Sequence, residues 1–164
     1  TRLSFERPTM SHTDFWIIRH GETDWNAERR LQGWRDIPLN PNGIAQAQAL
    51  DAHLQGCFSD ATPAHIYTSD LQRAYHTALP YAQSCNKPIH RLPGLRERNY
   101  GILEGQLWSE PTGFDSARNH NLTIELDQDE HRAEDLATFY ARIRQTLDHG
   151  WIAPGPAVGR WGSW

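Results

Sequence analysis

Cysteine is scarce in this chain of 164 residues, and long apolar runs are missing from it. Cys57 and Cys85 are the only cysteines, too few for a disulfide framework, so we expect a protein of the reducing cytoplasm. The purely apolar runs are only a few residues long and the mean hydropathy is −0.72. This pattern predicts neither a transmembrane helix nor a secretory signal sequence, and we expect no membrane partner.

An excess of basic residues is also absent. Lys and Arg number 16 against 20 Asp and Glu, which gives a net charge of −4. General nucleic-acid-binding proteins show the opposite balance, so we expect no nucleic-acid partner. Hydrophobic residues make up 38% of the chain, which is enough for a core and too much for a disordered protein. The length suits one domain, and the oligomeric state is left open.

Short apolar runs predict three strands, at 15–18, 64–68 and 88–90. The first run, from Phe15 to Ile18, is expected to be a buried strand with a loop at its carboxyl end. Strands that alternate with helices are typical of α/β folds, in which ligands bind at the carboxyl ends of the strands.

Helical patterns fill the intervals between and after these strands. Asn40 is a good cap and Pro41 a good first residue for one helix, which we expect Gly56 to stop. Ser69 and Asp70 are suitable caps for a second helix. The clearest amphipathic pattern predicts a third helix from Leu136, Phe139, Tyr140, Ile143 and Leu147.

Arg19 and His20 stand together after the first predicted strand, followed by Gly21, where a ligand can approach the backbone closely. A guanidinium group binds phosphate through two parallel hydrogen bonds, and a neutral imidazole can attack phosphorus. On its own, however, a histidine at a strand end is more often a structural residue.

Two further charged residues could serve in ligand binding or catalysis, but each also has an ordinary structural interpretation. Arg73 falls in the first turn of the second helix, where free N–H groups and the helix dipole attract anions, but a lone arginine there is usually solvated. Glu97 lies between Arg96 and Arg98, and it is either a proton donor or one half of an ion pair.

Four motifs occur in order along the chain. They are Arg-His-Gly-Glu-Thr at 19–23, Leu-Gln-Gly-Trp at 31–34, Ser-Asp-Leu-x-Arg-Ala at 69–74 and Leu-Arg-Glu-x-x-x-Gly at 95–101. Their order resembles the histidine phosphatase superfamily, the phosphoglycerate mutase-like proteins. The resemblance runs from 15 to 105 and implies an α/β fold with three α/β/α layers and a mostly parallel sheet. We expect a partial domain over 11–148, preceded by a leader or unstructured segment at 1–10.

The resemblance also implies roles for individual residues. His20 would be the nucleophile that becomes phosphohistidine, and Arg19 and Arg73 would clamp the phosphoryl oxygens. Glu97 would protonate the leaving oxygen and then activate water. Further substrate contacts are implied for Gly21, Asn26, Gln32, Gly33, Arg98 and Tyr100. The resemblance implies no metal ion or other cofactor, and no His and Cys spacing typical of a metal site opposes this.

The chain departs from the family pattern near its end. The family carries a second essential histidine in a His-Gly stretch, after an apolar strand that follows the late helix. His149 and Gly150 form such a pair, but no apolar strand precedes them, so we expect Gly150 merely to end the helix. Residues 149–164 are an atypical tail rich in Gly, Pro and Trp. Without the second histidine, turnover is expected to fall by a factor on the order of 10²–10³.

Three functions are compatible with these residues. The first is a phosphatase that acts on a small phosphorylated metabolite through a phosphohistidine. The second is a 2,3-bisphosphoglycerate-dependent phosphoglycerate mutase, which is disfavoured because only Arg118 follows Gly105 before Arg132 is reached. The third is an inactive phosphate-binding protein or a truncated product.

Overall fold

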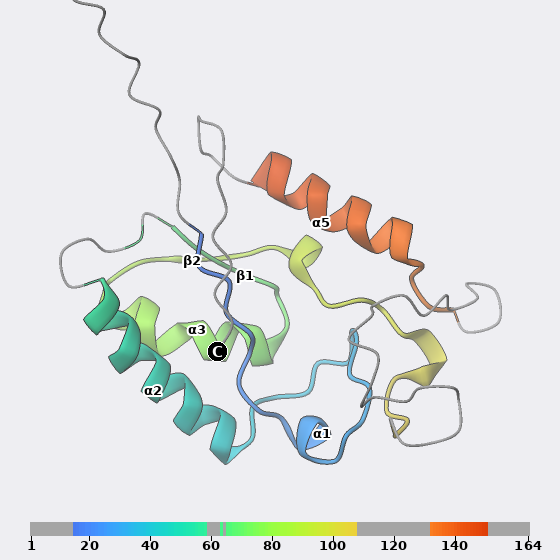
Figure 1. The fold of residues 1–164 in the computed structure, drawn as a ribbon, viewed down its shortest axis with the longest axis horizontal. Helices are drawn as coiled ribbons and strands as arrows, with labels where there is room; N and C mark the ends of the chain where they lie inside the picture. Colours follow the sequence, from blue (N-terminus) through green and yellow to red (C-terminus); the bar gives the residue numbers. More distant parts are fainter. Residues whose placement is uncertain (1–14, 59–62, 64, 108–131, 151–164) are drawn as a thin grey trace, which may run out of the picture.

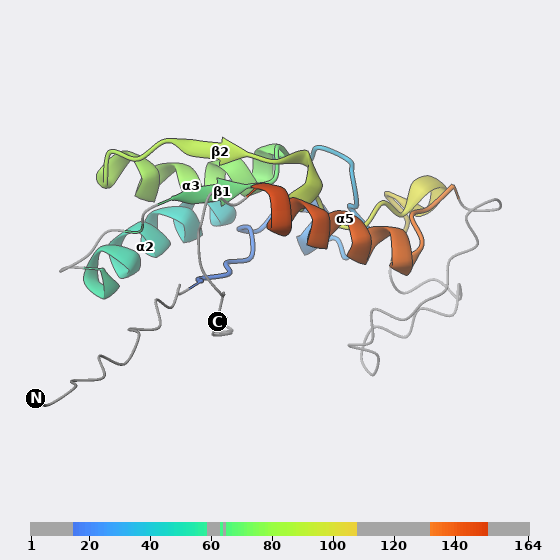
Figure 2. The same cartoon turned by 90° about the horizontal axis from the view of Figure 1, so that it is seen from above.

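Two parallel strands form the sheet in the described part of the chain. The computed structural model describes residues 15–58, 63, 65–107 and 132–150. Strands β1 (Ile66–Thr68) and β2 (Ile89–Arg91) pair in parallel and run side by side along α3 (Gln72–Ser84), which connects them (Figure 2). Strands were predicted at both places, and their parallel pairing is confirmed.

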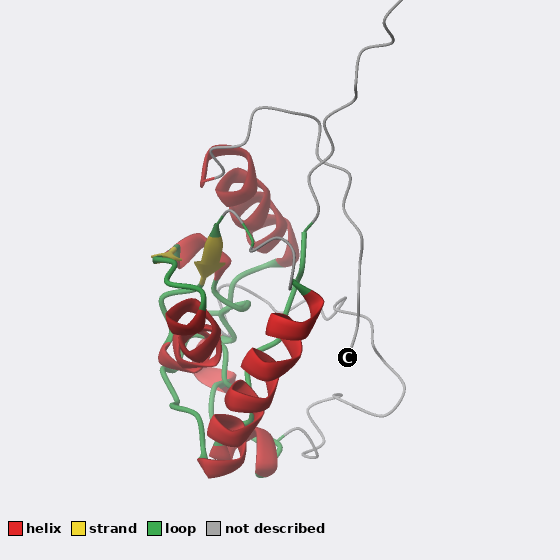
Figure 3. Cartoon of the chain, turned by 90° about the vertical axis from the view of Figure 1, so that its left-hand side faces the viewer, coloured by secondary structure: helices red, strands yellow, loops and turns green. Residues whose placement is uncertain are grey.

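Helices lie on both sides of this strand pair (Figures 1 and 3). On one side α3 packs against both strands, and α2 (Pro41–Cys57) packs against α3. On the other side lies α5 (Leu136–Gly150), which contacts the short helix η1 (Pro93–Leu95). The arrangement is the predicted α/β architecture. Of the helices described, none combines the length and the apolar character needed to cross a membrane.

Local signals specify α2 and α5 well. The Asn40 side chain accepts a hydrogen bond from the backbone N–H of Gly43 at 2.8 Å, and Pro41 is the first residue of α2, as predicted. The amphipathic helix predicted from Leu136 is α5. The expected stop at Gly56 is wrong by a short distance, because α2 continues to Cys57.

The predicted caps of α3 are wrong. Leu71 occupies the cap position and makes no side-chain capping bond. Instead, the backbone N–H of Gln72 donates to the Asp36 carboxylate at 2.7 Å. The carboxylate of Asp70 is already engaged by the guanidinium of Arg96. A residue distant in the sequence therefore satisfies the helix end, and local capping rules do not foresee this.

The predicted buried strand at 15–18 is also wrong. These residues form no strand pair within the described structure, and Trp16 and Ile17 are 50% and 57% exposed. The Trp16 ring lies edge-on to Phe58, just beyond the end of α2. An apolar run becomes a buried strand only where neighbouring strands pair with its backbone and other elements cover its faces.

Among the described residues, nearly as many polar residues as apolar residues are buried. The buried apolar side chains are Leu31, Leu39, Ala47, Leu54, Leu71, Tyr81, Ala82, Leu103 and Ala133. The buried polar ones are Thr23, Gln32, Asn40, Thr68, Ser69, Arg73, Thr77 and Arg98. Buried polar groups are costly unless they are hydrogen-bonded. Most of the polar set lies in or next to the predicted motifs, so the strongest constraints on this structure lie there.

The loop after His20 lies against the first turn of α2 at a very short backbone distance. A Cβ atom on Gly43 would lie 2.1 Å from the carbonyl oxygen of Glu22, and one on Gly21 would lie 2.7 Å from the carbonyl oxygen of Gly43. Both distances are far inside van der Waals contact. Glycine at these two positions therefore allows α2 to support the loop that carries His20.

Replacing Gly43 with alanine is expected to lower the free energy of unfolding by about 1–3 kcal/mol, because the backbone of Glu22 has to move. Gly56, in the same helix, has open space around it, and Gly56→Ala is expected to raise the free energy of unfolding by up to about 1 kcal/mol. Urea unfolding followed by circular dichroism measures both. Equal effects of the two substitutions would contradict the close approach at Gly43.

Candidate active site

The loop that carries His20 is held by α2 and α3. The backbone N–H of Gly21 donates to the hydroxyl of Thr77 on α3 at 2.9 Å. The backbone N–H of Glu22 donates to the side-chain oxygen of Gln46 on α2 at 2.8 Å, and the carbonyl oxygen of Glu22 accepts from the backbone N–H of Asn40 at 3.0 Å. Tertiary contacts therefore position this loop although the segment before it forms no strand.

The imidazole of His20 is held in its neutral form. Its Nδ1 lies 2.7 Å from the carbonyl oxygen of Gly21. A carbonyl oxygen can only accept, so Nδ1 carries the proton and Nε2 keeps its lone pair. Burial, as the largest cause, and the positive charges of Arg73 and Arg19 together lower the pKa of His20 to about 4, although the hydrogen bond to the carbonyl oxygen of Gly21 raises it. At neutral pH the imidazole is uncharged and can attack an electrophile.

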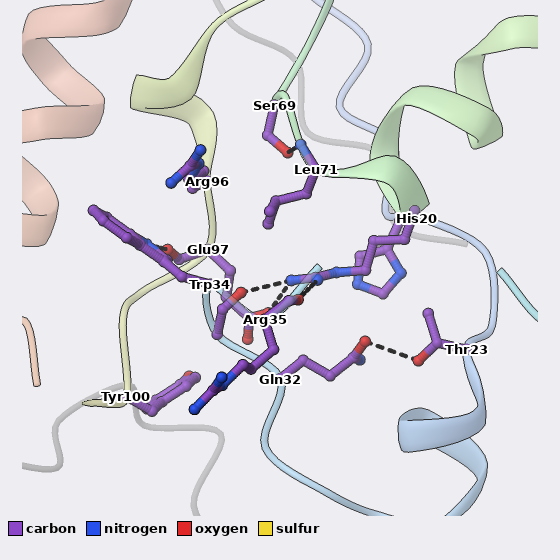
Figure 4. Close-up of polar contacts among 12 residues, drawn as sticks. His20, Thr23, Gln32, Trp34, Arg35, Ser69, Leu71, Arg96, Glu97 and Tyr100 are labelled. Carbon is purple, nitrogen blue, oxygen red and sulfur yellow. Dashed lines mark hydrogen bonds and ion pairs between the residues drawn. The ribbon is translucent and has the colours of Figure 1, made fainter. Parts of the chain in front are cut away.

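Arg73 is the most deeply buried charged side chain of the site, at 1% exposure. Its guanidinium donates to the carbonyl oxygens of Arg35 at 2.7 Å and Gly33 at 2.8 Å, and to the Glu97 carboxylate at 3.1 Å. In Figure 4, His20, Gln32 and Glu97 gather around these dashed contacts. Backbone carbonyls hold the guanidinium in one orientation while its charge is only partly neutralised, which suits the binding of an anion.

The carboxyl group of Glu97 accepts a hydrogen bond from Arg73, whose charge also acts on His20. Burial raises the pKa of Glu97, although the charges of Arg73 and Arg19 and the Arg73 hydrogen bond lower it. The side chain remains 40% exposed, so solvent can reach it. Its backbone carbonyl accepts from the indole N–H of Trp34 at 2.9 Å and from Arg142 at 3.2 Å. A raised pKa on a fixed carboxyl group favours a general acid.

Arg19 and Tyr100 complete the surroundings of these groups. Arg19 is exposed, yet its charge acts on both His20 and Glu97, as does that of Arg73. Two arginines that are far apart in the sequence therefore act electrostatically on the same two side chains, His20 and Glu97. Burial and the nearby negative charge of Glu97 raise the pKa of Tyr100 to about 12. Its hydroxyl is a donor at neutral pH.

Gly33 allows the loop that holds Arg73 to turn. Its φ is +54°, and a Cβ atom there would lie 2.2 Å from a carboxylate oxygen of Glu104. That same oxygen accepts from the backbone N–H groups of Trp34 at 2.8 Å and Tyr100 at 3.2 Å. Glu104 therefore ties the segment that presents the Gly33 carbonyl to the segment that follows Glu97.

Two of the predicted substrate contacts, Gln32 and Asn26, are joined through Thr23. The Thr23 hydroxyl is 2.8 Å from the side-chain oxygen of Gln32, and Asn26 closes a reciprocal cap around Thr23 at the start of α1 (Asp24–Ala27). This network braces the turn after His20. Direct contact of Gln32, Asn26 or Gly33 with a substrate stays a prediction.

Arg98 is buried and binds the segment that leads into α5. It is 3% exposed, and its Nε donates to the carbonyl oxygen of Glu134 at 2.7 Å. Its substrate contact also stays a prediction, and its placement indicates a structural bond. His149 is exposed in the last turn of α5, as expected of a residue at a helix end. The remainder of the predicted tail, 151–164, and the predicted leader lie outside the described residues.

Sequence reasoning missed four residues that support the site. They are Thr77, Trp34, Glu104 and Arg142. Two of them had a signal: Trp34 ends the motif at 31–34, and Thr77 stands four residues after Arg73 and so shares its face of α3. Among the described residues, no group of three or more His, Cys, Asp or Glu side chains is arranged to hold a metal ion.

Comparison with known proteins places this geometry in a family. The profile of the histidine phosphatase superfamily (branch 1) matches residues 15–152. A probable phosphoglycerate mutase, GpmB, of Serratia proteamaculans is 41% identical over 140 residues, which are 85% of this chain and 63% of that protein. A metal-independent phosphoserine phosphatase of Arabidopsis thaliana is 41% identical over 99 residues, which are 60% of this chain and 40% of that protein.

The fold agrees with solved structures. The crystal structure of phosphoglycerate mutase from Thermus thermophilus is 32% identical, with a TM-score of 0.56 over 86% of this chain and 72% of that one. The chain spans roughly half the length of the two relatives named above, with matches over 63% and 40% of them. Because the profile covers most of the chain and the fold agrees, the chain belongs to the histidine phosphatase superfamily.

Proposed function

We propose that this protein is a phosphatase that hydrolyses the phosphomonoester of a small metabolite through a phosphohistidine at His20. The observation that carries the proposal is the pairing of a neutral imidazole, whose Nε2 keeps its lone pair, with a protonatable Glu97 around one buried guanidinium, Arg73. A nucleophile, an acid and a group that binds the phosphoryl oxygens are the three parts needed to transfer a phosphoryl group from a phosphomonoester with release of an alcohol.

The first half of the reaction transfers the phosphoryl group to the protein. Nε2 of His20 attacks phosphorus, and the bond between phosphorus and the ester oxygen breaks. The leaving oxygen takes the proton of the Glu97 carboxyl group, so an alcohol leaves and Glu97 becomes a carboxylate. Arg73 and Arg19 stabilise the negative charge on the phosphoryl oxygens during transfer.

The second half returns the protein to its starting state. The Glu97 carboxylate takes a proton from water, and the water oxygen attacks phosphorus. The bond between phosphorus and Nε2 breaks, inorganic phosphate leaves, and both His20 and Glu97 regain their initial protonation. Protons balance over the cycle without a metal-bound hydroxide, in keeping with the name of the Arabidopsis relative, a metal-independent phosphatase.

Release of inorganic phosphate from p-nitrophenyl phosphate and from a panel of metabolite phosphomonoesters tests this function. We expect turnover together with an acid-labile phosphoryl group on His20, trapped by rapid quenching and located by mass spectrometry. The mutase alternative has the name of the Serratia relative in its favour. Turnover of phosphoglycerate only in the presence of 2,3-bisphosphoglycerate would support it. Phosphate binding without any turnover would instead favour an inactive phosphate-binding protein.

Replacing Glu97 with glutamine is expected to slow turnover of alkyl phosphates much more than that of p-nitrophenyl phosphate. An alkoxide needs a proton to leave and p-nitrophenolate needs little, so the loss for alkyl esters is expected to be roughly 10²–10⁴-fold. The acid must be protonated to act, so wild-type kcat/KM falls as the pH rises through the raised pKa of Glu97. This alkaline limb is expected to vanish in the variant. Equal losses for both ester types would remove Glu97 from the role of acid.

A further inference from the structure

We propose that Thr77 is a positioning residue for the nucleophile, whose hydroxyl fixes the backbone of His20 and Gly21 against the helix turn that carries Arg73. The inference rests on the proposed function for its kinetic part, because it concerns how the attacking nitrogen is held. The Thr77 hydroxyl bonds to backbone atoms of Gly21 and Arg73, so it acts on the imidazole of His20 through the peptide between His20 and Gly21.

The hydrogen bonds of Thr77 have only one consistent direction. Its hydroxyl is buried, 2.7 Å from the carbonyl oxygen of Arg73 and 2.9 Å from the backbone nitrogen of Gly21. The carbonyl can only accept, so the hydroxyl donates its single proton to Arg73. Its lone pair then accepts the N–H of Gly21. As donor and as acceptor, this hydroxyl therefore links the motif that contains Arg73 to the motif that contains Gly21.

Two successive peptides in the nucleophile loop are fixed from different helices. Thr77 of α3 holds the peptide that joins His20 to Gly21, and Gln46 of α2 holds the next peptide through the N–H of Glu22. The carbonyl of that second peptide accepts the Nδ1 proton of His20. The direction of the Nε2 lone pair therefore depends on both peptides.

Glycine makes these external bonds necessary. Gly21 has no side chain, so its φ and ψ angles are the softest in the loop. On the side of α2 its Cα packs against the backbone of Gly43, which limits translation. Rotation of the peptide before it is opposed by the bond to Thr77. Loss of that bond leaves a buried N–H without its partner and allows the imidazole to tilt.

A hydroxyl bonded to the carbonyl four residues earlier is by itself an ordinary feature of helices. Thr146 on α5 offers the matched control, because its hydroxyl makes the same bond to the carbonyl of Arg142 at 2.7 Å and lies on a helix that does not hold the nucleophile loop. Thr77→Val and Thr146→Val each remove a hydroxyl with little change of shape. Thr77→Ser keeps the hydroxyl and removes only a methyl group.

The kinetic test compares these three variants. For Thr77→Val we expect kcat for phosphomonoesters to fall roughly 10²-fold, the cost of a displacement of about 1 Å, while KM changes little because Arg73 still binds the phosphate. Thr77→Ser is expected to recover most of the rate, and Thr146→Val to keep it. A wild-type kcat in Thr77→Val, or a loss that Thr77→Ser does not recover, would overturn the inference.

A second measurement does not depend on turnover. Long-range proton–nitrogen correlation spectra at neutral pH report which ring nitrogen of His20 carries the proton. We expect the Nδ1–H form in the wild type, Thr77→Ser and Thr146→Val, and a mixture of forms in Thr77→Val. An unchanged tautomer in Thr77→Val refutes the positioning role. A shifted tautomer in a protein that releases no phosphate supports the positioning role while the proposed function fails.

The unaltered protein supplies a test if Thr77→Val does not fold. The Gly21 amide should then exchange its proton slowly with deuterated solvent, because Thr77 accepts it in a buried site. Exchange as fast as in an exposed loop would overturn the inference. Slow exchange that speeds up in a folded Thr77→Ala variant would support it.

Discussion

Replacement of His20 with alanine is expected to reduce phosphoryl transfer by a factor on the order of 10⁴–10⁶ and to abolish the acid-labile phosphoryl adduct. The imidazole of His20 is uncharged at neutral pH, and the positive charges of both Arg73 and Arg19 act on it. Water attacking directly, with the arginines still in place, accounts for the residual rate. Initial rates with p-nitrophenyl phosphate and quench-flow detection of the adduct measure the effect.

His149→Ala is the control for this substitution. His149 is exposed in the last turn of α5, and we expect its removal to leave the rate at the wild-type level. A large loss in His149→Ala would show that this residue reaches the site and would revise our view of the His-Gly pair at the end of the helix. Substantial turnover in His20→Ala would remove His20 from the role of nucleophile.

Arg73→Lys is expected to have the second largest effect, although it conserves the charge. Lysine cannot donate to the carbonyl oxygens of Gly33 and Arg35 and to a ligand at once, because it lacks the planar, forked donor set. We expect kcat/KM to fall by a factor on the order of 10²–10³. The free energy of unfolding should fall by about 1–3 kcal/mol, because a buried carbonyl loses its partner.

Arg35→Lys provides the matched comparison in the same loop. Only the carbonyl oxygen of Arg35 takes part in holding Arg73, while its own side chain is 65% exposed and 3.5 Å from Glu104. We expect a near-wild-type rate and an unfolding transition within experimental error of the wild type. If Arg35→Lys slowed the reaction as much as Arg73→Lys, loss of the loop geometry rather than of the clamp would explain both results.

The tertiary environment decided the points at which sequence reasoning failed. The run from Phe15 to Ile18 has strand composition, but no described strand pairs with it. Asp70 is a good cap by composition, but Arg96 engages its carboxylate and Asp36 supplies the cap instead. At Asp70 a competing partner from elsewhere in the chain outweighed a local preference of about 1 kcal/mol, and at 15–18 a strand preference of similar size was not enough without a paired strand.

Arg98 makes a bond in the structure that the sequence did not indicate. The family resemblance implies a substrate contact for Arg98, which stays a prediction, and in the structure its side chain is buried and donates to the carbonyl oxygen of Glu134. Thr77 is distant from His20 in the sequence, but its hydroxyl accepts a hydrogen bond from the N–H of Gly21, the residue that follows His20.

The sequence by itself determined the α/β class, the helices that begin at Pro41 and Leu136, and the motifs that contain His20, Arg73 and Glu97. These features depend on caps, periodicity and residue chemistry, all of which act over a few residues. Only the tertiary structure decided the protonation of His20 and Glu97 and the orientation of Arg73. Desolvation and hydrogen bonds between distant segments set these properties, and both exist only once the chain has packed.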